Sequence, residues 1–193
     1  MFPVSAFFHH ERIFAMDGTF INEKLECGAR LIAEKLPNFH SVTAGIWVGA
    51  GSVTETPEEN GISHLIEHML FKGTEKRTAK QIAVDVDNIG GQINAFTSKE
   101  CTCYYIKVID EKLADGLEIL TDLFCRATLQ TEELDKERNV VLEEIAMSND
   151  NPEDLAMDLI SSTYFNGSSL EKTILGPADN IRRFGRGDLV DYM

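Results

Sequence analysis

Strand-like segments in this sequence come in pairs joined by short turns, and helical patterns follow them without regular alternation. Residues 25–36 and 41–51 read as two strands, and Pro37 and Asn38 between them predict a β-hairpin. Residues 92–109 have the β-branched and aromatic content of two further strands, with a turn at Ser98 to Glu100. This order predicts an α+β fold, a two-layer sandwich with a mainly antiparallel sheet and helices packed on one face.

Helical patterns occupy most of the remaining chain. Thr78 and Gln81 have capping-box spacing, and Thr131 is the expected N-cap of a long acidic helix. From Asp110 onward, a core-facing apolar stripe is expected at Leu113, Leu117, Leu120 and Phe124. The other expected helices cover about residues 61–71, 78–89, 131–148 and 153–165, with a fresh start near Gly187-Asp188.

We expect two parts in the chain. Residues 1–24 form an N-terminal extension with the first strand region, and residues 25–193 form one domain. The helix that starts near Gly187-Asp188 is followed closely by Met193, so the domain is expected to be truncated before its final strand.

Charge and cysteine content narrow the function classes. Eighteen Lys and Arg against 32 Asp and Glu give a formal charge of −14, which repels nucleic acid and excludes it as an expected partner. The four cysteines have no C-x-x-C spacing and no secretory leader is recognisable, so a cytoplasmic location is expected. No apolar run is long enough to span a membrane, so no membrane contact is expected.

The stretch "HLIEHMLFKGT" carries the chemistry. His64 and His68 lie one helical turn apart, so both imidazoles can reach one metal ion, and Glu67 beside them is free to accept a proton. Zinc in a hydrolytic site takes three protein ligands and leaves a position open for water. The competing interpretation is an amphipathic helix with two satisfied core histidines.

A third ligand would come from another element. Glu137 and Glu144 in the 131–148 helix are seven residues apart, which at about 100° per residue places them within about 20° of each other. One of the two could ligate the metal while the other orients a ligand or holds a proton. The spacing alone leaves the choice between them open.

The motif and its surroundings resemble a known family. "NGISHLIEHMLFKGT" is similar to the inverted zinc motif of the pitrilysin, insulysin and mitochondrial processing peptidase family, the inverzincins. Three further blocks occur in the family's order and spacing: "VGAGSVTETPEENG", "GGQINAFTSKECTCYY" and "ERNVVLEEIAMSNDNPED". The resemblance covers residues 25–193 and implies the N-terminal catalytic domain of a zinc metalloendopeptidase.

The resemblance also implies roles for single residues. One Zn²⁺ per chain would be held by His64, His68 and Glu144. Glu67 and Glu137 would be the catalytic carboxylates, Glu67 as general base and Glu137 supporting the site without necessarily touching zinc.

Substrate and partner follow from the same resemblance. The family binds extended peptides as an added β-strand, and Asn94, Ala95 and Phe96 are the positions expected against substrate. Family members close a chamber with a homologous partner domain or subunit. The alternative to a peptidase acting on extended peptides or presequences is a non-catalytic binding or assembly subunit of the same family, inactive without its partner.

Overall fold

The computed structural model describes residues 18–193, which form two compact units that divide after His40. Most of the extension expected over residues 1–24 therefore lies outside the described residues. The boundary expected at residue 24 would separate two paired strands, since β1 (Thr19–Lys24) ends there and pairs with the next strand. No helix in the described part of the chain is long and apolar enough to cross a bilayer.

The first unit contains an antiparallel hairpin of β1 and β2 (Arg30–Lys35). The hairpin predicted between residues 25–36 and 41–51 is therefore wrong. The turn of the observed hairpin lies within residues 25–36, which were predicted to form one strand. There the Leu25 N–H donates to Ala29 O at 2.8 Å. Gly28 lies in this turn and adopts φ 92°, a left-handed conformation that glycine reaches without strain.

The second unit contains a three-stranded antiparallel sheet in the order β3 (Ser41–Val48), β5 (Thr102–Ile109), β4 (Gln92–Thr97). The predicted strand pair in residues 92–109 is confirmed, with Thr97 opposite Thr102 at the turn. β5 lies in the centre, and β4 has one edge that pairs with no strand of the described chain.

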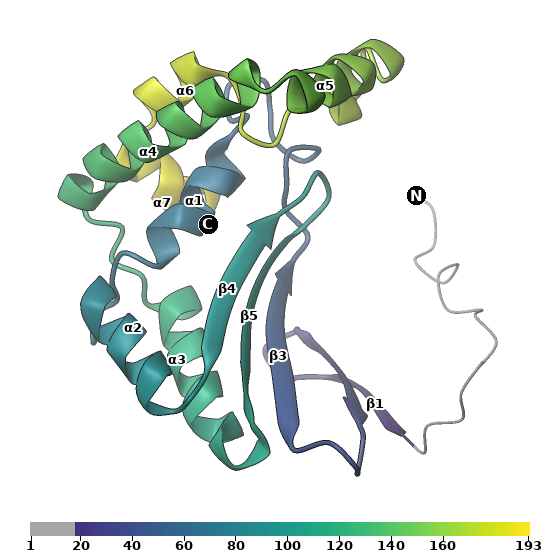
Figure 1. Ribbon diagram of the computed structural model, residues 1–193, viewed down its shortest axis with the longest axis vertical. Coiled ribbons are helices and arrows are strands. Elements are labelled where there is room, and N and C mark those ends of the chain that lie inside the picture. Colours follow the sequence, from purple (N-terminus) through teal and green to yellow (C-terminus); the bar gives the residue numbers. More distant parts are fainter. Residues whose placement is uncertain (1–17) are drawn as a thin grey trace. The chain divides into compact units, whose positions relative to one another are not determined.

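Helices account for most of the rest of this unit, and Figure 1 shows α1, α2 and α3 on the same side of the sheet. The helices are α1 (Ile62–Leu70), α2 (Ala79–Asn88), α3 (Leu113–Cys125), α4 (Thr131–Asp150), α5 (Pro152–Tyr164), α6 (Ala178–Arg183) and α7 (Arg186–Tyr192). Short 3₁₀ turns cover Asp110–Lys112 and Ser169–Glu171.

The helix starts were predicted with mixed success. Thr78 caps α2 by accepting the Gln81 N–H, but the Gln81 side chain bonds to Asp85 and does not complete a capping box. Thr131 is the first residue of α4 and not its N-cap. The short helix α6 was not predicted, because it lies in a segment that was read as a loop.

The hydrophobic core lies between the sheet and the helices. Alternate residues of β5, Tyr104, Ile106 and Val108, are at most 3% exposed and face the helical layer. The opposite face of the sheet carries exposed aromatic side chains, including Trp47 and Phe96. One covered face and one open face confirm the α+β sandwich with its helices on one side.

The buried face of α3 differs from the predicted stripe. Leu117 is 40% exposed, whereas Ile119 and Leu123 are buried with Leu120. Gly116 lies so close to the sheet that an added Cβ would be 3.2 Å from the Val108 side chain. Because α3 lies closest to the sheet at Gly116, the helix face that meets the core is the one with Ile119, Leu120 and Leu123.

A buried carboxylate joins α3 to the turn after α1. Asp122 is fully buried and accepts hydrogen bonds from Thr74 Oγ1 at 2.7 Å and from the Arg77 guanidinium at 2.8 Å. Burial raises the pKa of Asp122, but the bonds from Thr74 and Arg77 lower that pKa by more, so it lies below its usual range. The ionised carboxylate is therefore the form that stabilises the fold.

We expect Asp122→Ala to lower the free energy of unfolding by about 1–3 kcal/mol, because the buried Thr74 hydroxyl loses its acceptor while Arg77 keeps Asp85 and Glu118. Asp115→Ala removes an exposed pair with Lys112 from the same helix and should cost less than about 1 kcal/mol. Urea denaturation measures both. The effect of Asp122→Ala should shrink as the pH falls below about 4, the ordinary pKa of an aspartate in the unfolded chain, and should be lost once the pH passes the lowered pKa of Asp122 in the folded protein. Equal effects of the two variants would contradict this role of Asp122.

Candidate metal centre

Helix α1 presents both histidines on one face. The His64 and His68 rings lie 4.7 Å apart between centroids, while Leu65 and Met69 on the other side of the helix are fully buried. The four-residue spacing therefore does what the sequence predicted and brings two imidazoles together at the helix surface.

Helix α4 adds a carboxylate to this pair. Glu144 Oε2 lies 3.8 Å from His64 Nε2 and 3.6 Å from His68 Nε2. The three residues offer ligand atoms that all lie within 4.8 Å of one another. Nitrogen and oxygen ligands of tetrahedral zinc lie about 3.3–3.6 Å from one another. The three residues therefore fit a zinc ion after small shifts of the side chains.

The protonation state of His64 is the one that a metal ligand needs. Burial, and then the charge of His68, lower the pKa of His64 to about 4, so this ring is neutral at pH 7 and keeps a lone pair for a metal. His64 Nδ1 is buried and makes no hydrogen bond within the described residues. Because Nε2 is the nitrogen that faces Glu144, the unpaired Nδ1 does not distinguish a metal ligand from a core histidine.

Glu67 lies beside the histidines and is held from the sheet. Its Oε2 accepts a hydrogen bond from Thr97 Oγ1 at 2.5 Å. Burial raises the pKa of Glu67, and the bond from Thr97 opposes this rise without cancelling it. A carboxylate with a raised pKa is a stronger proton acceptor than an exposed one.

Glu137 does not belong to the three-residue group. Its Oε2 lies 3.1 Å from His68 Nδ1, and its Oε1 lies 2.6 Å from Lys72 Nζ. When His68 Nδ1 carries the proton and donates it to Glu137, Nε2 is left free to face Glu144. The placement is that of a residue that orients His68, which is a supporting role of the kind that the resemblance implied for Glu137.

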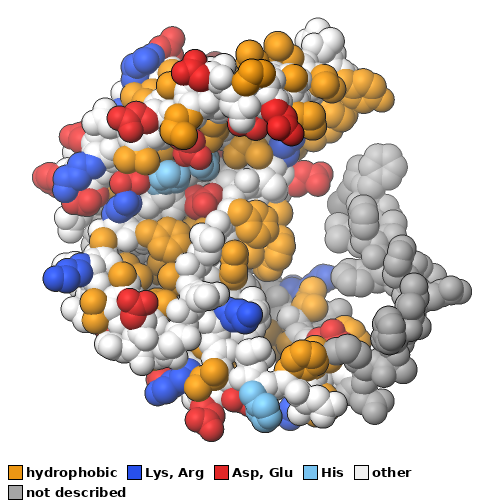
Figure 2. Space-filling model, in the orientation of Figure 1, with side chains coloured by type: hydrophobic (Ala, Val, Ile, Leu, Met, Phe, Trp, Pro, Cys, Tyr) orange, Lys and Arg blue, Asp and Glu red, His pale blue; other side chains and the backbone are white. Residues whose placement is uncertain are grey.

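His64 opens into a cleft of about 430 Å³ beside the edge strand β4. Ala95 and Phe96 line the cleft, whereas Asn94 does not and instead accepts the Ala95 N–H on Oδ1 at 2.9 Å. That bond shows the Ala95 N–H facing away from β5, toward the free edge of the strand. Figure 2 shows histidine surface in the recess beneath α4 and α5, with acidic side chains on the helices around it.

Sequence reasoning missed several residues of this cleft. Asp154 and Asp158 line its far side from α5, and their four-residue spacing was a usable signal. No such signal marks Thr97, which also lines the cleft, or Lys72, which pairs with Glu137 outside it, because their partners lie in other elements.

Comparisons with known proteins identify relatives of this chain. A family model described as "Insulinase (Peptidase family M16)" matches residues 30–178. The uncharacterized zinc protease YmxG of Bacillus subtilis is 49% identical over 166 residues, which is 86% of this chain and 41% of that protein. The human mitochondrial-processing peptidase subunit beta is 38% identical over 169 residues, 88% of this chain and 34% of that protein.

Solved structures show the same fold. A protease from Helicobacter pylori superposes with a TM-score of 0.86 at 25% identity, covering 91% of this chain and 42% of that chain. A peptidase M16 inactive domain from Pseudomonas fluorescens gives a TM-score of 0.84 at 16% identity, covering 90% of this chain and 42% of that chain.

Fold and comparisons together define a zinc protease-like domain. The chain belongs to the insulinase family of peptidases, peptidase family M16. It spans about two fifths of the length of the curated relatives it matches.

Loss of a residue that only supports a metal ligand weakens metal binding by about 10–100-fold. We expect Glu144→Gln to weaken zinc binding by more than this, because the charged ligand oxygen itself is removed. Isothermal titration with zinc measures the change. Glu143→Gln, an exposed neighbour on the same helix, is the matched control and should leave binding unchanged. Equal zinc affinity in Glu144→Gln and Glu143→Gln would reject Glu144 as a ligand.

Proposed function

We propose that this chain is the metal-binding domain of a zinc-dependent endopeptidase that hydrolyses extended, basic peptides. The observation that carries the proposal is the meeting of His64, His68 and Glu144 beside Glu67, at the free edge of a β-strand. The metal site and a surface for an extended chain therefore share one cleft.

His64, His68 and Glu144 would hold the zinc ion. When bound, the ion would supply Lewis acidity, which polarises the scissile carbonyl and makes water a stronger acid. Glu137 would act as a positioning residue, fixing the ring of His68 through Nδ1 while Lys72 holds the carboxylate in place.

Glu67 would move the proton. Its carboxylate accepts a proton from the attacking water as the water oxygen bonds to the peptide carbon, and it later donates that proton to the departing nitrogen as the C–N bond breaks. Thr97 donates to Oε2 of Glu67 and so limits the rotation of the carboxylate. No covalent bond between the chain and the peptide is required.

The edge of β4 would bind the substrate backbone. Main-chain pairing with residues 94–96 would hold a peptide in an extended form largely independent of its sequence. Asp154 and Asp158 of α5 line the same cleft as Glu67 and Glu144. These four acidic side chains outnumber Lys99, the one lysine or arginine that the described residues place in the lining. This imbalance favours peptides with basic side chains.

A homologous partner domain or subunit is part of the proposal. The chain covers 34% of a relative that is itself named a subunit, so the closing half of a chamber would come from sequence beyond this chain or from another protein. A cytoplasmic location stays a prediction, resting on the four unpaired cysteines.

The second candidate function is a non-catalytic binding or assembly subunit. The match to a solved M16 domain named inactive shows that this fold also occurs in such a domain. The presence of Glu67 together with all three candidate ligands favours the peptidase, because a binding subunit needs no general base.

Glu67→Gln tests the catalytic proposal. We expect the variant to keep its zinc affinity, because the three ligand residues remain, and to lose about 10²–10⁴-fold in kcat, because the proton acceptor is gone. The assay is cleavage of a quenched, unstructured basic peptide, with chelator-treated wild-type protein as the blank. Wild-type turnover that resists the chelator, or full activity in Glu67→Gln, would refute the mechanism.

The double variant Asp154→Asn, Asp158→Asn tests the choice of substrate. We expect kcat/KM for the basic peptide to fall by about 2- to 20-fold, since each exposed charge pair contributes little. A peptide with glutamine in place of its basic residues should be cut equally by both proteins. Glu153→Gln, on the same helix but outside the cleft lining, is the control. An unchanged preference for the basic peptide would remove these residues from the account.

A further inference from the structure

A buried carboxylate outside the catalytic group holds the start of α1. Glu55 is 2% exposed, and each of its oxygens is used. Oε1 accepts the Ser63 N–H at 3.0 Å, and Oε2 accepts the Gly61 N–H and the Asn60 Nδ2 amide, both at 2.9 Å. Three N–H donors around one buried carboxylate satisfy it with no cation at the carboxylate.

These bonds cap the helix that carries the histidines. Gly61, the N-cap residue, has no side chain to offer, and the first turn of α1 contains no acidic residue. Glu55 therefore supplies from a preceding loop both the missing acceptor and the negative charge that a helix N-terminus favours. His64 follows directly after Ser63, so the capped turn is the one that positions this imidazole.

The same loop is tied to the wall of the cleft. Asn60 Nδ2 also donates to Thr173 O at 2.8 Å, and Lys172 Nζ donates to the backbone oxygen of Glu55. Residues 173–175 line the cleft opposite β4. Glu55 and Asn60 thus connect the helix that carries His64 with the wall that a bound peptide would contact.

Two glycines make this connection close. Gly61 and Gly176 both have positive φ, at 100° and 70°. A Cβ on Gly61 would lie 2.6 Å from Leu175 O, and a Cβ on Gly176 would lie 2.3 Å from Asn60 O. The two backbone segments therefore touch, and movement in one is passed to the other.

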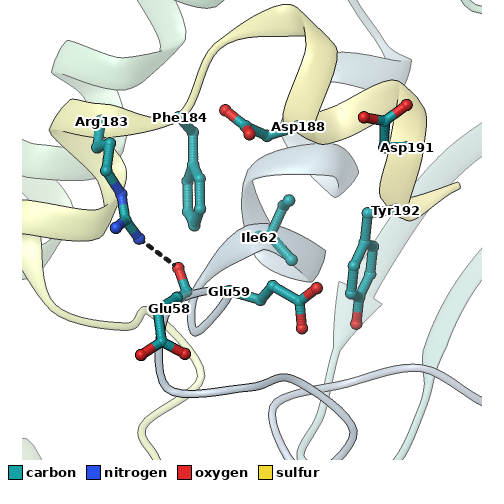
Figure 3. Close-up of a pocket in the computed structure, with 8 residues that line it drawn as sticks. All are labelled: Glu58, Glu59, Ile62, Arg183, Phe184, Asp188, Asp191 and Tyr192. Carbon is teal, nitrogen blue, oxygen red and sulfur yellow. Dashed lines mark hydrogen bonds between the residues drawn. The ribbon is translucent and has the colours of Figure 1, made fainter.

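The other side of the loop is fixed by the C-terminal helices. Asn180 Nδ2 donates to Pro57 O at 2.8 Å, and the Arg183 guanidinium donates to Glu58 O at 2.6 Å. Figure 3 shows the Arg183 bond, with Ile62 of α1 beside the same loop. The loop is held through its backbone from both sides, which leaves the Glu55 carboxylate free to cap α1.

We propose that Glu55 is a positioning residue that fixes His64 and links the first turn of α1 to residues 173–175 of the cleft wall. The inference rests on the proposed function, because it gives Glu55 a part in holding the metal site. Glutamine at this position could accept from one side only, and its NH₂ group would face an N–H donor on the other.

Glu55→Gln is the first test. We expect Co²⁺ affinity, followed by the visible absorption of the bound ion, to fall about 10-fold or more. Hydrogen exchange without metal should become faster in residues 61–66 and 172–175 and stay unchanged in α4. Glu58→Gln, an exposed glutamate in the same loop, is the matched control. Asp122→Ala serves as a destabilised comparison that should leave the Co²⁺ affinity of the folded protein unchanged.

Asn60→Ala is the second variant and decides the matter if Glu55→Gln does not fold. It leaves the two backbone bonds of Glu55 and removes the link to Thr173, so exchange should rise in residues 172–175 and Co²⁺ affinity should change less than about threefold. Unchanged exchange in both segments for a folded Glu55→Gln, or in residues 172–175 for Asn60→Ala, would overturn the inference. Wild-type protein that binds no Co²⁺ would instead refute the proposed function, and the exchange arm would still test Glu55.

Discussion

The packing of α1 against α4 is the constraint on which the site depends. Each helix contributes fully buried side chains to one core, Leu65 and Met69 from α1 and Leu134 and Val141 from α4. This packing sets the separation of His64 and His68 from Glu144, which no hydrogen bond among the three would fix. Around it, Glu137 orients one imidazole and Glu55 caps the turn that carries the other. Close packing resists displacement, so the ligand set is held before a metal arrives.

The electrostatics of the cleft are consistent with this arrangement. Burial keeps His64 neutral and makes Glu67 a better proton acceptor, and both effects follow from lying between the sheet and the helices. The edge strand β4 supplies backbone groups on one side, and α5 supplies acidic side chains on the other. The groups to which the proposed function assigns the metal, the proton and the substrate backbone therefore lie in and beside one cleft.

Some patterns within single elements were predicted from the sequence. The i, i+4 histidines and the seven-residue spacing of Glu137 and Glu144 depend only on helical geometry, so their faces could be worked out in advance. The strand pair in residues 92–109 could be predicted because the turn residues Ser98 to Glu100 separate two β-rich segments.

Contacts between distant elements were not predictable in this way. The pairing of β2 with β1 depended on a turn hidden within residues 25–30, and the face of α3 depended on the approach at Gly116. Glu55 and Lys172 meet across 117 positions of sequence, and Thr97 reaches Glu67 from another element. Such contacts are set by tertiary packing, which leaves no periodic signal in the residues themselves.

The most direct test of the central claim is diffraction from crystals of the zinc-loaded chain, recorded on both sides of the zinc absorption edge. The account predicts one anomalous peak between α1 and α4, about 2.0–2.2 Å from His64, His68 and Glu144, with Glu137 remaining on His68 Nδ1. An anomalous peak at other residues would contradict it. The absence of any peak in crystals grown with saturating zinc would contradict it too.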